Sequence, residues 1–170
     1  MPQFEHQRHK IRSSASASSE LILACAPMRS NINISGIARS ASASGIKRLI
    51  LTGNAKLINK IARDGADALS VEVHRSLEPV LRGFREAGFR LVGLEQTTNS
   101  QDLNHYAFHP KSVLVIGNER LGLTDEILAL LDDVIEIPVY GLPHSFNASS
   151  ATAMALYEYR RQLSAGLRPE

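Results

Sequence analysis

Residues 21–52 read LILACAPMRSNINISGIARSASASGIKRLILT, and this stretch decides the expected fold. Its two apolar runs, 21–26 and 48–52, have the length and composition of buried strands. Residues 34–44 between them follow a helical pattern, and Gly45 stands where helices often end in the left-handed conformation. A strand, a helix and a second strand in this order place the two strands parallel in one sheet.

The same alternation continues to the end of the chain. Further strands are expected at 69–73, 89–95, 112–117 and 134–138, and further helices at about 55–64, 77–87, 124–131 and 147–163. Apolar strands separated by helices are typical of a mostly parallel sheet that is covered on both faces. The sequence therefore predicts an α/β fold with a mostly parallel sheet and helices on both faces.

Composition excludes several classes of protein. No apolar run approaches the roughly 20 residues of a membrane helix, and the first residues lack the apolar core of a signal peptide. The one cysteine, Cys25, leaves no internal disulfide, and its apolar neighbours favour a buried side chain over a reactive thiol. The histidines show no metal-site spacing. We expect a cytoplasmic protein with no metal and no membrane contact.

The chain divides into two parts. Residues 1–20 carry basic residues and then a Ser/Ala run, with little apolar surface to bury, so we predict a flexible tail. An arm that touches RNA phosphates or a second subunit is the less favoured alternative. Residues 21–170 form the predicted folded domain. The net charge of +2 and the pI near 8.9 permit an RNA partner without requiring one.

Common ligand-binding motifs are missing from the sequence. It has no Gly-x-Gly-x-x-Gly after the first strand, no Gly-x-x-x-x-Gly-Lys-Ser/Thr phosphate loop and no Gly-x-Ser-x-Gly elbow. A dinucleotide-binding domain, a P-loop NTPase and an α/β-hydrolase are therefore not expected. The Gly-rich loop of the common methyltransferase fold is missing as well.

Three polar, glycine-containing segments carry the functional prediction. They are NISGIAR at 33–39, GNERLGL at 117–123 and IPVYGLPHSFNAS at 137–149. The last two follow predicted strands, and ligands of parallel sheets lie beyond the carboxyl ends of strands. Taken singly, each segment is also compatible with a helix cap or a surface turn; Asn33, for example, lies where it could cap its helix.

Together and in this order, the segments resemble the SpoU (TrmH) family of SPOUT methyltransferases. The family motifs run Asn-x-x-x-x-x-Arg, Gly-x-Glu-x-x-Gly-Leu and Ile-Pro-Met-x-Gly-x-x-x-Ser-Leu-Asn-Val-Ser, and the resemblance covers about residues 21–163. Here Val139 replaces the methionine and Phe146 the leucine, while the polar positions are unchanged.

The resemblance implies a deep trefoil knot at the C-terminus and a homodimer that transfers a methyl group from S-adenosylmethionine to an RNA ribose 2′-hydroxyl. Its catalytic positions fall on Asn33, Arg39, Glu119, Ser145 and Asn147. Its methyl-donor pocket falls on Gln96, Thr97, Gly117, Ile137 and Phe146. In the family, the arginine comes from the second subunit. Because a guanidinium is a poor base, we expect Arg39 to clamp the phosphate and stabilise the developing alkoxide instead of removing the proton.

The target RNA is a separate question. Residues 93–103 resemble larger eukaryotic enzymes that methylate a D-loop guanosine ribose, which favours tRNA over rRNA. Lys47, Arg48, Lys56 and Lys60 are candidate RNA contacts, although such charges are more often a solvated face. Three alternatives remain: a non-catalytic knotted RNA-binding module, a knotted base methyltransferase, and a flavodoxin-like small-molecule binder.

Overall fold

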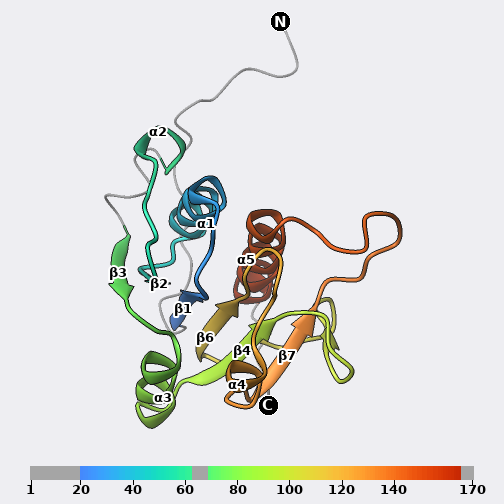
Figure 1. The fold of residues 1–170 in the computed structure, drawn as a ribbon. Coiled ribbons are helices and arrows are strands. Elements are labelled where there is room, and N and C mark those ends of the chain that lie inside the picture. Colours follow the sequence, from blue (N-terminus) through green and yellow to red (C-terminus); the bar gives the residue numbers. More distant parts are fainter. Residues whose placement is uncertain (1–19, 63–68, 166–170) are drawn as a thin grey trace, which may run out of the picture.

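The structure is a computed structural model that describes residues 20–62 and 69–165. The predicted tail lies outside these residues, apart from Glu20, which begins the first strand. The strands form one seven-stranded sheet in the order β3-β2-β1-β6-β4-β7-β5 (Figure 1). Every neighbouring pair in it is parallel. The strands are β1 (Glu20–Cys25), β2 (Arg48–Thr52), β3 (Ser70–His74), β4 (Arg90–Leu94), β5 (Gln101–Asp102), β6 (Lys111–Ile116) and β7 (Asp133–Glu136).

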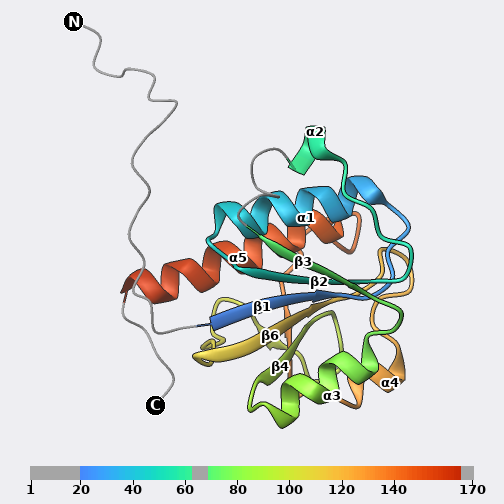
Figure 2. The same ribbon diagram turned by 90° about the vertical axis from the view of Figure 1, so that its left-hand side faces the viewer.

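Helices cover both faces of the sheet, as predicted. The long helices α1 (Asn31–Ala43) and α5 (Ala148–Ala165) lie together on one face, with α2 (Asn59–Ala62) beside α1. The other face carries α3 (Glu78–Glu86) and α4 (Asp125–Leu128), as Figure 2 shows. The predicted α/β class is therefore confirmed.

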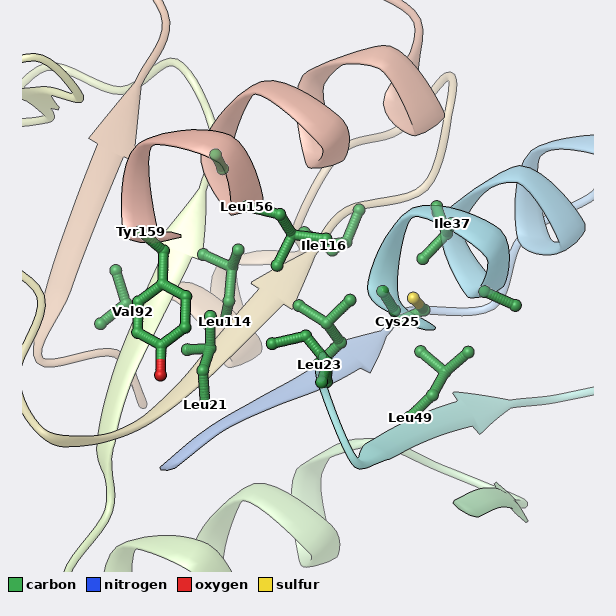
Figure 3. Close-up of a cluster of buried hydrophobic side chains, with 14 of the residues drawn as sticks. Leu21, Leu23, Cys25, Ile37, Leu49, Val92, Leu114, Ile116, Leu156 and Tyr159 are labelled. Atoms are coloured by element: carbon green, nitrogen blue, oxygen red, sulfur yellow. The ribbon is translucent and has the colours of Figure 1, made fainter. Parts of the chain in front are cut away.

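The position of β1 inside the sheet explains its apolar sequence. Leu23 and Cys25 point into the core under α1 and α5 (Figure 3), while Ile22 and Ala24 point into the core under α3. A strand that is covered on both faces has no side for polar residues. Burial, helped by the negative charge of Glu119, raises the pKa of the Cys25 thiol to about 12, so the expected inert cysteine is found.

The final helix, α5, contains small residues because it packs closely against α1. A Cβ placed on Gly36 of α1 would collide with the Ser149 side chain of α5, so the two backbones approach each other closely at this point. Within residues 20–62 and 69–165, no helix is long and apolar enough to cross a membrane.

Some local predictions were wrong or incomplete. The cap of α1 is Ser30 rather than Asn33, because the Ser30 Oγ accepts the Asn33 amide at 3.2 Å and the helix begins at Asn31. Strand β5 was not predicted, since two polar residues cannot show a strand pattern. Helix α2 begins four residues later than the predicted 55, and it ends at the undescribed residues 63–68.

Candidate active site

A cleft opens at the carboxyl edge of the sheet, where β4, β6 and β7 end. Its empty volume is about 830 Å³ including the space at its open mouth. The loops at 117–123 and 139–147 both contribute to its walls, as the sequence predicted. The predicted residues that line it are Gln96, Gly117, Glu119, Ile137, Ser145 and Phe146. Thr97, Asn33, Arg39 and Asn147 do not line it.

The 117–123 loop is a tight backbone turn. Asn118 and Gly122 exchange both of their backbone hydrogen bonds at 3.0 Å. The Asn118 side chain donates to the carbonyl of Pro27 at 2.6 Å and so ties this turn to the loop after β1. A Cβ on Gly117 would lie 2.8 Å from the Gly122 carbonyl carbon, which explains why glycine follows β6 directly.

Glu119 turns its carboxylate from this loop towards the start of α1. One oxygen accepts the Ser30 amide at 3.0 Å and the Asn33 side chain at 3.2 Å, and the other accepts the Arg29 amide at 3.2 Å. Partial burial pushes the pKa of Glu119 upwards, but hydrogen bonds from its own backbone, these amides and Asn33 outweigh that effect and lower it. The carboxylate is therefore held as an anion at neutral pH.

A chain of amide hydrogen bonds joins Glu119 to the last of the three motifs. Asn33 donates to Glu119, and its own side-chain oxygen accepts from the Asn147 amide group at 3.0 Å. The Asn147 side-chain oxygen in turn accepts the Ser149 amide at 2.9 Å, so Asn147 caps α5. Asn33 and Asn147 thus stand behind the cleft wall and connect all three motifs.

The remaining predicted residues lie in three different parts of the structure. Ser145 and Phe146 lie on the exposed segment that leaves β7 and returns to α5 (Figure 1). Thr97 instead closes a turn through hydrogen bonds with Ser100, one of them at 2.8 Å. Arg39 is exposed on α1 and makes no hydrogen bond or ion pair with the described residues. Six helical residues rotate it about 120° from Asn33 and move it about 9 Å along the axis, which takes it away from this cleft.

The sequence analysis missed Glu95, which lines the cleft at the end of β4. Its carboxylate accepts the Leu123 amide at 3.1 Å and the Gln96 amide at 3.0 Å, so it joins two walls of the cleft. A Cβ on Gly122, whose φ is +66°, would strike this carboxylate. The signal was available, since Glu95 ends a predicted strand in the same way as Glu119 follows one. Glu136, also in the lining, accepts the Ser100 hydroxyl at 2.7 Å.

The sequence matches the profile of the SpoU rRNA Methylase family over residues 20–157. The chain belongs to this family. Within the part of the chain that the structure describes, no cluster of three or more His, Cys, Asp or Glu could hold a metal. The SpoU assignment agrees with the three motif segments, which Asn33 connects by hydrogen bonds to Glu119 and Asn147 beside the cleft.

The SpoU relatives include the tRNA (guanosine(18)-2′-O)-methyltransferase TARBP1 of Mus musculus. It is 40% identical over 93 residues, which are 54% of this chain and 6% of the mouse protein. The chain thus spans a small fraction of that relative's length.

Solved SpoU structures share the whole fold. The A. aeolicus TrmH/SpoU tRNA modifying enzyme has a TM-score of 0.82 and 28% identity, covering 92% of this chain and 83% of that one. The SpoU methyltransferase AviRb of Streptomyces viridochromogenes, in complex with AdoMet, has a TM-score of 0.76 and 30% identity, covering 98% of this chain and 67% of that one.

Proposed function

We propose that this chain transfers a methyl group from S-adenosylmethionine to a ribose 2′-hydroxyl of tRNA. The observation that carries the proposal is the hydrogen-bonded chain Glu119–Asn33–Asn147. It joins the three motif segments beside one cleft at the sheet edge where ligands of parallel α/β folds bind. The named activities of the mouse and A. aeolicus relatives support tRNA as the substrate.

The cleft residues fit this methyl donor. Apolar side chains from three strand ends, Leu94, Ile116 and Ile137, offer a surface for an adenine ring. Three glutamates, Glu95, Glu119 and Glu136, outnumber the one cationic residue among the described lining residues, Arg120, and this excess of negative charge suits a sulfonium cation. AviRb, with 30% identity, binds AdoMet in its own structure.

When it is bound, the donor supplies an electrophilic methyl group, and the protein has to align an oxygen with it. Glu119 holds the Arg29 and Ser30 amides in place and so fixes the loop after β1 against the 117–123 loop. Asn147, two residues after the exposed Ser145, fixes the start of α5. We assign positioning of the ribose to Ser145 and ordering of the walls to Glu119, Asn33 and Asn147.

Arg39 is the phosphate clamp in this proposal, and it acts in the cleft of a second copy of the chain. It faces away from its own cleft, and in a homodimer it would complete the other one. The layer formed by α1 and α5 carries exposed apolar side chains that a second subunit would cover: Ile32 is 64% exposed and Tyr157 is 74% exposed. Arg39 would hold the phosphate and stabilise the alkoxide, while the phosphate or water takes the proton.

A complementation assay tests this dimer. Co-expressed Arg39→Ala and Glu119→Gln chains form mixed dimers that contain one cleft with both residues intact, if Arg39 crosses the interface. The assay uses an S-adenosylmethionine concentration well below the Kd of the Glu119→Gln chain, where Arg39→Ala is inactive and Glu119→Gln is strongly impaired. Random pairing then restores roughly a quarter of wild-type methyl transfer. If Arg39 acted in its own cleft, the mixture would transfer no more methyl than the mean of the two variants alone.

We further propose the family's deep trefoil knot at the C-terminus, formed where 117–123 and 139–147 meet at the cleft. The domain would comprise residues 21–170, preceded by a flexible tail at 1–20, and the protein would act in the cytoplasm. Main-chain groups would hold most of the adenine of the methyl donor. The residues proposed to bind it are Gln96, Thr97, Gly117, Ile137 and Phe146.

The substrate is tested by mapping 2′-O-methyl riboses in total RNA from cells with and without the gene. We expect one tRNA position, a D-loop guanosine, to lose its methyl group in the deletion strain. Loss of an rRNA methyl group instead would select the rRNA alternative. A methylated base would select the base methyltransferase. Unchanged RNA, together with the absence of transfer in vitro, would leave a non-catalytic binding module.

A further inference from the structure

The loop after β2 is fixed to α1 by side-chain contacts that the catalytic site does not require. The Asn31 side-chain oxygen accepts the Lys56 amide at 3.1 Å. One helical turn later, the Ser35 hydroxyl accepts the Ile58 amide at 2.8 Å and donates to the Asn31 carbonyl at 2.6 Å. Ser35 is fully buried. This loop and the start of α2, residues 53–60, are therefore held in one position relative to α1. We call these residues the 53–60 segment.

The hydrogen bonds at Lys56 and Ile58 set the direction in which the segment runs along α1. Lys56 is tied to the first turn of α1 and Ile58 to the second, and the third turn carries Arg39. Helix α2 continues from Asn59 and packs along α1, as Figures 1 and 2 show. Lys60 lies on α2, which contacts α1. Lys56, Lys60 and Arg39 therefore all lie on α1 or on the segment packed against it.

These cations are free to bind a ligand. Lys56, Lys60 and Arg39 are all exposed, and none makes an ion pair or a side-chain hydrogen bond with residues 20–62 or 69–165. Their position also separates them from the other basic candidates. Because β2 runs from Arg48 to Thr52, Lys47 and Arg48 lie at the amino edge of the sheet, and Arg48 is paired with Glu72 at 3.0 Å. The 53–60 segment instead follows the carboxyl end of β2 and contacts α1, the helix that carries Arg39, so in the proposed homodimer it would accompany Arg39 to the cleft of the second copy.

We propose that the 53–60 segment is a phosphate-binding wall for the RNA strand next to the methylated nucleotide, with Lys56 and Lys60 as phosphate contacts and Ser35 as the positioning residue. This inference rests on the proposed function, because it extends the phosphate clamp of Arg39 to the flanking nucleotides. Ammonium groups on a fixed backbone give affinity for the RNA backbone without base specificity. Recognition of the target sequence would lie elsewhere.

The test measures how salt affects RNA binding. A fluorescein-labelled, unmodified tRNA transcript is titrated with the full chain at several NaCl concentrations, using wild type, Lys56→Gln/Lys60→Gln and the control Arg82→Gln/Arg85→Gln on α3. The control removes the same charge from exposed residues away from the segment. We expect the slope of log Kd against log salt to fall by about 2 in the first variant and to stay near wild type in the control. Calorimetry should give both variants wild-type affinity for S-adenosylmethionine.

Ser35→Ala provides the second measurement. Loss of its hydroxyl frees the Ile58 amide, so the KM for tRNA should rise several-fold while kcat and the KM for S-adenosylmethionine stay unchanged. A general folding defect would alter all three values. Equal salt slopes in the lysine variant and its control would overturn the inference. A wild type that binds the transcript with the expected slopes but transfers no methyl group would instead overturn the proposed function and leave this wall as an RNA-binding surface.

Discussion

Replacing Glu119 by glutamine should weaken methyl-donor binding by disconnecting two loops. The carboxylate accepts three hydrogen bonds, from the Arg29 and Ser30 amides and from Asn33. A glutamine oxygen can keep the two bonds made by one carboxylate oxygen. The other position becomes an NH2 group that faces the Arg29 amide, so one acceptor is lost and two donors oppose each other.

The size of the effect follows from these contacts. Hydrogen bonds to charged groups contribute about 1.5–3 kcal/mol each when they are well shielded. Because Glu119 is only half-buried, we expect the substitution to destabilise the ordered arrangement of the two loops by about 1–2 kcal/mol. Since about 1.4 kcal/mol is a factor of ten, the Kd for S-adenosylmethionine should rise by about 5- to 30-fold. The melting temperature should fall by about 2–8 °C in a domain of this size.

Isothermal titration calorimetry with S-adenosylmethionine measures this change, and Glu126→Gln on α4 is the matched control at a fully exposed glutamate. The pH dependence gives an independent check. Because the folded-state pKa of Glu119 is lowered, its contribution is present above the ordinary value of 4.5 and is lost as the pH falls through the lowered value. Wild-type affinity should therefore hold from neutral pH down to about 4.5. Unchanged affinity in Glu119→Gln would refute the role of this carboxylate.

Three further predictions follow from single residues. Arg39→Ala should reduce turnover by at least about 100-fold while calorimetry shows unchanged S-adenosylmethionine binding; normal turnover would exclude a role in the reaction. Gly122→Ala should weaken donor binding by about tenfold or more, because its φ of +66° disfavours a side chain and the new Cβ strikes Glu95; alanine at exposed Gly83, which has open space around it, is the control. Cys25 should resist thiol reagents in the native protein and react on denaturation, since it is buried and its pKa is raised to about 12; rapid native labelling would contradict this burial.

The sequence by itself determined the layers of this protein and the loops that carry its site. Apolar runs on both faces of β1 and β6 predicted buried parallel strands, and Gly45 marked a helix end where φ is +69°. Such features depend on each residue's own conformation and burial, so a local pattern reports them. The predicted loops 117–123 and 139–147 followed strand ends and therefore had to share an edge.

Only the tertiary structure decided which side chains meet. Asn33 contacts Glu119 across 86 residues of sequence and Asn147 across 114, and these contacts depend on the strand order that places β6 beside β1. The sequence singled out Asn33 by its place in the first motif and offered a helix cap as the alternative, because a cap needs only neighbouring residues. Glu95 ends a predicted strand, but its contact with Leu123 on another loop is visible only in the fold. Local chemistry fixes which groups are available, but their partners are fixed by chain topology.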